Sequence, residues 1–227
     1  MSDDEKYLEY EQERRQEALA QRQKTDWLYV GILVFATVTC VWWITHSPVH
    51  ADAGQTAPND PIQTDATDIK PWWNTNFMVV PLSRYDITAR VLIHHEYHFD
   101  NTVGIRPFDF GLGWGAMSDP ANYQKVRFSQ DSRWLCWEYD SDLLQKLGSV
   151  YIQSHISNNH LIPANAEIRA KLVAVRDNET IRIKGYLVEV RWNDHGELQT
   201  MRSGLSNMAT GDGACRLIWV EDMQEVF

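Results

Sequence analysis

The chain of 227 residues has only three cysteines, too few for the disulfide framework that stabilises small secreted domains. It also lacks an excess of positive charge, because 21 Lys and Arg stand against 31 Asp and Glu, a formal net charge of −10. Since a nucleic-acid-binding protein needs clustered positive charge to displace counterions from phosphates, we expect no nucleic-acid partner. General disorder is excluded by a hydrophobic content of 44% with 10 Trp.

Formal charge is absent from residues 27–45 (WLYVGILVFATVTCVWWIT). A helix of this length measures about 28 Å, close to the thickness of the hydrocarbon core of a bilayer. Trp27 and Tyr29 at one end, with Trp42 and Trp43 at the other, are the aromatic residues expected at the two membrane interfaces. The pattern predicts a transmembrane helix, with the lipid bilayer as its partner.

Two alternatives to an uncleaved anchor are a buried helix of a soluble protein and a cleaved signal peptide. The small-x-small sequence Ala51-Asp52-Ala53 imitates a cleavage site. However, the head of 26 residues contains eight acids, and the apolar run is longer than that of a signal peptide. Five Lys and Arg precede the span and none occurs in residues 46–69, which predicts a cytoplasmic N-terminus and an exported remainder.

The composition divides the rest of the chain into three parts. Residues 1–26 are rich in Glu, Gln, Arg, Lys and Ala without Gly or Pro, which favours a charged helix that runs into the span. Residues 46–70 contain three Pro and no aromatic residue and are interpreted as a flexible stalk. Residues 71–227 form the exported folded domain.

Strand patterns dominate this domain. Between Tyr85 and Phe99 the odd positions are mostly apolar and the even positions mostly polar, which predicts one long, half-buried strand with a bend. Further strands are predicted over 77–80, 126–129, 134–139, 150–156, 180–192, 198–205 and 216–221, with a hairpin turn at 193–196. Helices are predicted after the cap residue Asn165 and over 141–147. The expected fold is one transmembrane helix plus a mainly β (α+β) domain, a small barrel or sandwich with an OB-like arrangement as one option.

Cys136 and Cys215 both lie in the exported part, in or beside predicted strands. An oxidising compartment favours a disulfide between them. The alternative is a pair of buried thiols. Cys40 lies within the membrane span and is interpreted as a packing or lipid-facing residue.

The run His94-His95-Glu96-Tyr97-His98 invites a metal interpretation. It is one residue short of the zincin motif, which also requires a helix rather than a strand. A strand would place His94, Glu96 and His98 on one face in steps of about 7 Å. A divalent metal on that face is therefore one hypothesis, and solvated side chains are the other; otherwise no cofactor is expected.

The segment Ser154–Ala164 (SHISNNHLIPA) concentrates polar side chains that catalysis uses. In a catalytic interpretation His155 or His160 acts as a base or ligand, Asn158 orients it, and Ser203 is a partner from a neighbouring strand. Asn and Ser are also ordinary turn residues, and a His also satisfies buried backbone groups, so a structural role is the alternative. The glycine-rich Gly111–Gly115 lacks a phosphate-binding context and indicates close backbone turns around Trp114.

Four runs carry a resemblance to a known group of proteins: DFGLGWGAMSD (109–119), SHISNNHLIPA (154–164), VRDNETIRIKGYLV (175–188) and TGDGAC (210–215). Over about residues 75–222 the chain resembles a group of bacterial proteins in which a short N-terminal membrane anchor precedes this domain. The resemblance implies an inner-membrane anchor and a periplasmic domain. It implies no activity.

We therefore expect a non-enzymatic, single-pass inner-membrane protein whose periplasmic domain binds a protein partner as an accessory or structural subunit of an envelope complex. Seven Trp in the exported part supply core and interface anchors, and self-association into a homo-oligomer is a further option. The alternative is a membrane-tethered hydrolase that uses His155 and His160, with or without a divalent metal.

Overall fold

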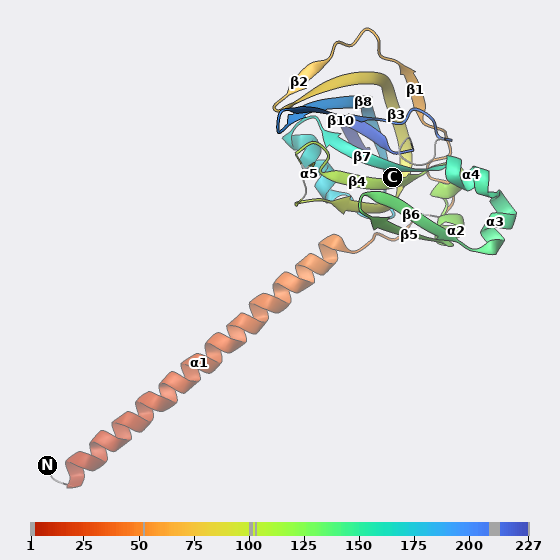
Figure 1. Cartoon of the computed structure of the whole chain (residues 1–227). Coiled ribbons are helices and arrows are strands. Elements are labelled where there is room, and N and C mark those ends of the chain that lie inside the picture. Colours follow the sequence, from red (N-terminus) through yellow and green to blue (C-terminus); the bar gives the residue numbers. More distant parts are fainter. Residues whose placement is uncertain (1–2, 52, 100–101, 103, 209–213, 227) are drawn as a thin grey trace. The chain divides into compact units, whose positions relative to one another are not determined.

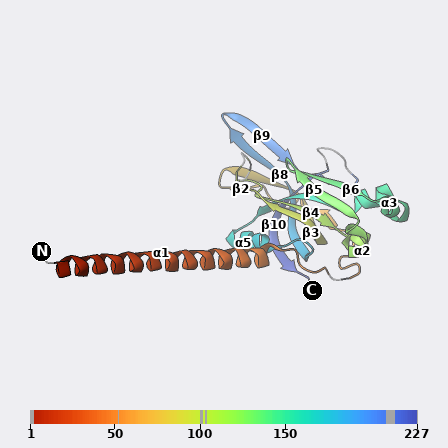
Figure 2. The ribbon, with the colours of Figure 1, turned by 90° about the horizontal axis from the view of Figure 1, so that it is seen from below.

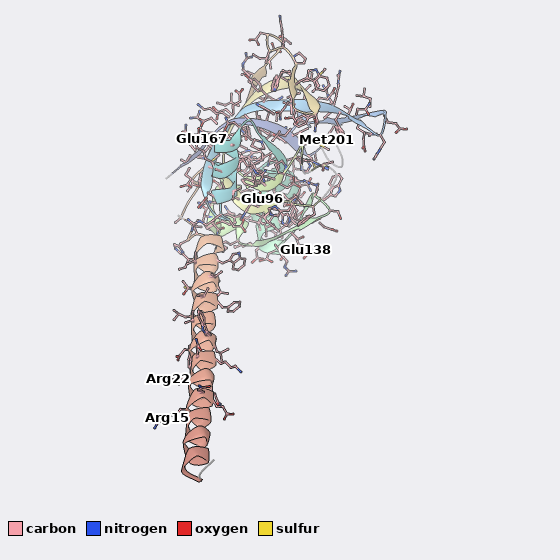
Figure 3. The ribbon with its side chains drawn as sticks, turned by 90° about the vertical axis from the view of Figure 1, so that its left-hand side faces the viewer. Arg15, Arg22, Glu96, Glu138, Glu167 and Met201 are labelled. Atoms are coloured by element: carbon pink, nitrogen blue, oxygen red, sulfur yellow. The ribbon has the colours of Figure 1, made fainter. Side chains whose placement is uncertain are left out.

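A computed structural model describes the whole chain except residues 1–2, 52, 100–101, 103, 209–213 and 227. The chain forms two compact units, residues 1–47 and 48–227. The first unit is a single uninterrupted helix, α1 (Asp3–His46) (Figure 1). Arg15 and Arg22 project from its charged half (Figure 3).

The apolar half of α1 is exposed. All residues from Asp26 to Ile44 are exposed, including Trp27, Tyr29, Trp42 and Trp43. By length and composition the helix is able to cross a membrane. Because a large exposed apolar surface is unfavourable in water, this half of the helix is suited to a membrane anchor or a signal sequence.

The second unit is a β-rich domain with a mostly closed sheet. Its eight strands are β1 (Ile62–Asp65), β2 (Trp72–Asn74), β3 (Phe77–Glu96), β4 (Phe108–Gly113), β7 (Ile156–Pro163), β8 (Thr180–Asp194), β9 (Glu197–Arg202) and β10 (Arg216–Glu225). A separate hairpin consists of β5 (Val126–Asp131) and β6 (Trp134–Tyr139). The helices are the 3-10 turn η1 (Gly115–Ser118), α2 (Pro120–Tyr123), α3 (Ser141–Leu147), α4 (Ser149–Ser154) and α5 (Ala166–Ala174).

The sheet closes because β3 pairs with strands at both ends of one path. The order is β3-β4-β7-β10-β8, and β8 pairs again with β3. Only β7 and β10 are parallel along this path; the other four pairs are antiparallel. Register shifts at Pro81–Ser83 and Val91–Ile93 bend β3, so that its 20 residues reach both partners (Figure 1). The bent strand predicted over 85–99 is therefore confirmed as far as Glu96, and it is continuous with the strand predicted over 77–80.

The interior of the closed sheet is apolar. Alternate residues of β4, namely Phe108, Phe110 and Leu112, point into the main core with Ile87 and Leu161. A second cluster lies on the outer side of the sheet, where the β5–β6 hairpin, α3 and α4 pack. This second layer forms the wall of the candidate site.

Residues 48–70 are not the flexible stalk that their composition suggests. They belong to the compact unit, and β1 pairs with β3. Ala57 is 1% exposed, and its carbonyl accepts a hydrogen bond of 2.8 Å from the Gly115 amide. The segment has few large apolar side chains and is held mainly by hydrogen bonds and by small side chains in buried positions. Such contacts cannot be recognised from composition.

Further elements differ from the sequence prediction, and residues 157–163, for which no strand was predicted, form most of β7. Residues 149–154 form α4, not the start of a strand, because Gly148 at φ +78° separates α3 from α4 and Ile152 of α4 is fully buried. The strand β4 was not predicted at all, since two glycines mask its alternation. The helices α3 and α5 are confirmed, as is the hairpin of β8 and β9, which projects beyond its neighbours (Figure 2).

Candidate functional site

The outer faces of β4 and β7 carry a set of polar side chains beneath the β5–β6 hairpin. The register pairs Asp109 with His160 and Gly111 with Asn158. Since paired residues of an antiparallel sheet share a face, all four lie on the same side. The inward-facing phenylalanines of β4 alternate with them, so the alternation of β4 places Asp109 outside the main core.

Glycine at position 111 allows the hairpin to approach the sheet closely. A Cβ atom there would lie 2.8 Å from a side-chain carbon of Ile93 and 3.1 Å from one of Leu135. Leu135 belongs to β6 and is 8% exposed. The glycine-rich motif thus serves packing, as predicted for the turns around Trp114, and it sets the height of the hairpin above β4 and β7.

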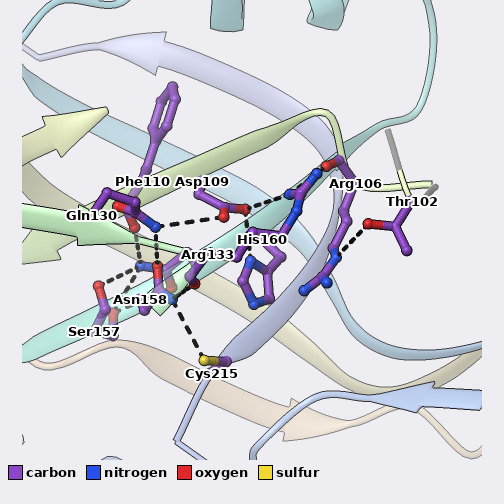
Figure 4. A network of polar contacts seen from close by, with 11 residues as sticks. Thr102, Arg106, Asp109, Phe110, Gln130, Arg133, Ser157, Asn158, His160 and Cys215 are labelled. Atoms are coloured by element: carbon purple, nitrogen blue, oxygen red, sulfur yellow. Dashed lines mark hydrogen bonds and ion pairs between the residues drawn. The ribbon is translucent and has the colours of Figure 1, made fainter. Parts of the chain in front are cut away.

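A buried carboxylate joins the sheet to the hairpin. Oδ1 of Asp109 lies 2.6 Å from Nδ1 of His160 and 3.3 Å from Nη1 of Arg133 (Figure 4). Asp109 is fully buried, and His160 and Arg133 are 5% and 8% exposed. Because a carboxylate accepts hydrogen bonds, the His160 Nδ1–H donates, and this contact fixes the orientation of the imidazole ring.

Arg133 reaches Asp109 from the turn of the hairpin. Its backbone has φ +71° and that of Ser132 has φ +48°, values that non-glycine residues rarely adopt. The Arg133 guanidinium lies 3.8 Å from the centre of the Tyr97 ring and donates a hydrogen bond of 3.0 Å to the Arg106 carbonyl. These contacts stabilise an unfavourable turn conformation and fix the hairpin tip on the sheet.

Amide side chains extend the network toward the last strand. Gln130 Nε2 lies 3.4 Å from both Asp109 Oδ2 and Asn158 Oδ1. Asn158 Nδ2 donates a hydrogen bond of 2.7 Å to the Arg133 carbonyl and lies 3.5 Å from Sγ of Cys215 (Figure 4). Residues from three of the sequence motifs, around positions 109, 158 and 215, therefore meet in one place.

Two cavities adjoin this network. The larger, of about 330 Å³, is a cleft between the hairpin, the start of β7, residues 206–208 and the start of β10. Its apolar lining includes Trp134, Leu135, Trp137, Ile156 and Met208, and its polar lining includes Asn158, Asn207 and Arg216. The smaller cavity, of about 160 Å³, is lined by His160, Arg106, Arg133 and Arg202 and shares Trp134 and Cys215 with the cleft.

The structure separates the residues of the predicted catalytic set. His160 and Asn158 belong to the network, whereas the His155 ring stacks on Tyr151 with centroids 3.7 Å apart. His155 Nε2 faces Asp60, 3.7 Å away. Ser203 accepts a hydrogen bond of 3.0 Å from the Leu217 amide, and none of the contacts seen in the described part of the chain joins it to His160.

The predicted metal ligands make other contacts. Nδ1 of His94 lies 2.7 Å from Oδ1 of Asp177, and Oε1 of Glu96 accepts a hydrogen bond of 2.7 Å from Arg169. His98 lies 3.9 Å from the other oxygen of Glu96. Within the residues that the structure describes, no three His, Cys, Asp or Glu side chains form a group that would hold a metal ion.

The predicted disulfide between Cys136 and Cys215 is not present. All three cysteines are described and no two of them are bonded. The reason lies in the alternation of β6. Leu135 and Trp137 face the cleft, which Cys215 also lines, whereas Cys136, between them, is exposed on the opposite face of the hairpin.

Sequence reasoning missed Asp109, Gln130 and Arg133, although Asp109 opens one of the four motifs. The charge of Asp109 in the run FDFGLG was itself a usable signal, since Asp109 stands between two aromatic residues of a strand that has no other polar side chain. The partners on the hairpin carry no such signal, because a turn Ser-Arg pair is typical of a solvated loop.

Comparison of the chain with models of known protein families, with curated proteins and with solved structures gives no significant match.

Proposed function

We propose that the protein is a single-pass, membrane-anchored binding protein whose β-rich domain holds a protein partner in the cleft beside the β5–β6 hairpin. The observation that carries this proposal is the cleft itself, of about 330 Å³ with two tryptophans in its wall. Concave, mostly apolar surfaces with a few polar groups are the usual form of binding sites, and buried Trp residues are frequent energetic centres of interfaces.

The strand order supports a binding role. A closed path with one parallel pair, β7 and β10, and a helix, α5, between β7 and β8 has the topology of an OB-type barrel, and we assign the domain to that architecture. In such barrels the ligand lies on the face of the second and third strands, between the loops that follow the first and fourth strands. Here those strands are β4 and β7, which carry the polar network beside the cleft.

The membrane assignment rests on α1 and on the charge distribution. We propose that residues 27–45 cross the bacterial inner membrane, with residues 1–26 in the cytoplasm and the β-rich domain in the periplasm, because the basic residues that flank the span precede it.

Co-purification from an uncharged detergent tests the proposal. We expect the full chain to retain a stoichiometric protein partner, and the double substitution Trp134→Ala and Trp137→Ala to release it. Leu198→Ala is the matched control, because Leu198 is 72% exposed on β9 and does not line the cleft. A partner retained equally by all three proteins, or an isolated monomer from the wild-type chain, would contradict the proposal; a mass equal to a multiple of the chain would identify the partner as a second copy.

A hydrolase is the second candidate, and the Asp109–His160 pair favours it. The ring is oriented by a buried carboxylate 2.6 Å from Nδ1, and His160 lines a cavity of about 160 Å³. This is the arrangement in which an imidazole Nε2 acts as a general base toward water. A panel of ester and amide substrates tests it: hydrolysis that His160→Gln abolishes, with the fold unchanged, supports the candidate, and no hydrolysis by the wild-type chain removes it.

A further inference from the structure

Arg216 is a buried arginine that lines the cleft, and no carboxylate among the residues that the structure describes pairs with it. Arg216 begins β10 and lines the cleft, yet it is 1% exposed. Its Nη1 donates a hydrogen bond of 2.9 Å to the Gly204 carbonyl, and its Nη2 donates to the side-chain oxygen of Asn207. Its Nε has no hydrogen-bond partner among the described residues. Both partners are neutral, so no described residue compensates the guanidinium charge.

Two other arginines of the domain are paired with carboxylates. Arg133 is paired with Asp109 at 3.3 Å, and the half-exposed Arg182 is paired with Asp86 at 2.6 Å. For Arg216 no Asp or Glu of the described chain lies within ion-pair distance; its nearest aromatic neighbour is the Tyr85 ring, 5.4 Å from Cζ. A charge removed from water without a counter-ion is costly, which indicates that the counter-charge arrives with a ligand.

We infer that the cleft binds a peptide segment whose carboxylate pairs with Arg216 and whose neighbouring apolar side chain lies between Trp134 and Trp137. The carboxylate belongs to the end of the chain or to an Asp or Glu side chain. A bidentate carboxylate is the ligand that the guanidinium geometry suits best. The two indole rings supply the apolar contact area for the side chain.

The polar wall of the cleft distinguishes a peptide from a fatty acid. Gln153, Asn158 and Asn207 line the cleft together with the apolar residues. Their amide groups donate and accept hydrogen bonds and thus match the N–H and C=O groups of a peptide backbone. An alkyl chain would offer these amide groups no further hydrogen bond. The inference rests on the proposed binding function and specifies the chemistry of the partner.

A peptide selection tests this inference. The full chain in dodecyl maltoside is immobilised and exposed to a pool of random heptapeptides with a free carboxyl end and to the same pool with amidated ends, and retained peptides are sequenced by mass spectrometry. We expect at least tenfold enrichment of peptides that have a large apolar residue beside a carboxylate. Enrichment confined to the free-ended pool identifies the chain end as the ligand, and equal enrichment of Asp- or Glu-containing peptides in both pools identifies a side chain.

Substitutions at Arg216 separate recognition from folding. Arg216→Gln should reduce retention of an enriched peptide at least tenfold without lowering the melting temperature, because it removes an uncompensated charge rather than a pair. Arg216→Lys keeps the charge and should retain part of the binding. Arg127→Gln is the control, since Arg127 is 84% exposed on β5 and paired with Glu138 outside the cleft.

Three outcomes overturn the inference. Neither pool yields enriched peptides, the enriched peptides show no preference for a carboxylate, or the folded Arg216→Gln variant retains a selected peptide as well as the wild-type chain does. Displacement of the selected peptide by sodium oleate at a lower concentration than by the free peptide also overturns it and assigns the cleft to a fatty acid. A last outcome is that a stoichiometric partner co-purifies with the wild-type chain and is lost on substitution of Trp134 and Trp137, while the selected peptides show no preference for a carboxylate. In that case the inference fails and the proposed function stands.

Discussion

Asp109 and His160 face each other across β4 and β7, with Oδ1 of the carboxylate 2.6 Å from Nδ1 of the imidazole. The same oxygen atom lies 3.3 Å from the guanidinium of Arg133, which is carried by the turn of the β5–β6 hairpin. One buried carboxylate therefore connects the closed sheet with the hairpin that forms the wall of the cleft. The geometry of the cleft depends on this connection.

Replacement of Asp109 by Asn tests the connection. The substitution removes the carboxylate charge that pairs with the buried Arg133, and we expect the free energy of unfolding to fall by about 3–5 kcal/mol. Urea unfolding of the full chain in a mild detergent measures the change. Asp131→Asn is the control, because Asp131 is exposed at the end of β5, and a change within about 0.5 kcal/mol is expected there. Equal effects of the two substitutions would contradict a structural role of the buried pair.

Gly185→Ala tests the closure of the sheet. A Cβ atom at this position would lie 1.9 Å from the carbonyl oxygen of Trp219 on β10, opposite a register shift between Val220 and Asp222. A backbone atom has little freedom to move, so we expect a loss of about 3 kcal/mol or more in unfolding free energy. Gly104→Ala should be nearly neutral, since nothing lies within 4 Å of its added carbon. A stable Gly185→Ala variant would show that β8 and β10 are not paired in this register.

We expect Glu189 to contribute to the loss of folding stability at acid pH. Burial by itself would raise the pKa of this carboxyl, but hydrogen bonds from Arg202 and Arg191 outweigh burial and hold the pKa below its usual value of 4.5. A lowered pKa in the folded state stabilises the fold above the unfolded value, and this contribution is lost as the pH falls through the folded value. We expect Glu189→Gln to flatten the decline in stability below about pH 4.5, measured by urea unfolding across that range. Parallel curves for both proteins would contradict this assignment.

We expect Tyr85 to contribute to the loss of folding stability at alkaline pH. Burial raises the pKa of this phenol to about 12, although the nearby Arg216 lowers it in part. The neutral phenol is thus favoured in the folded state, and its stabilising effect is lost as the pH rises from the unfolded value near 10 toward 12. Tyr85→Phe should remove that decline. It should also raise the unfolding free energy at neutral pH by up to about 1 kcal/mol, because the Tyr85 hydroxyl is buried and no described residue forms a hydrogen bond with it. Ultraviolet titration that shows Tyr85 ionising near pH 10 would contradict both expectations.

Local patterns predicted much of the fold. The alternation around Ile87 and Val91 predicted β3, and the cap residue Asn165 with Ile168 and Leu172 predicted α5. These elements bury a regular face, so their period appears in the sequence. The segment before β1 was misassigned as a stalk because its stability comes from contacts such as that of Ala57 with Gly115, which only the folded sheet creates.

The site was predicted only in part for a related reason. His160 and Asn158 belong to one conspicuous motif, and both are in the network. Asp109 and Arg133 are 24 residues apart and meet only because a glycine at 111 allows the hairpin to pack on β4. Pairing between a turn residue and a strand residue has no local period. The predicted bridge between Cys136 and Cys215 failed because the alternation of β6 turns Cys136 away from the cleft.

Photo-crosslinking in native membranes tests the central claim most directly. A photoreactive amino acid in place of Trp134, at the mouth of the cleft, is compared with one in place of Leu198 on β9, and both side chains are exposed. We predict one discrete protein adduct from position 134 and none from position 198. If position 134 gives no adduct, or the same adducts as position 198, the cleft is not where this protein binds its partner.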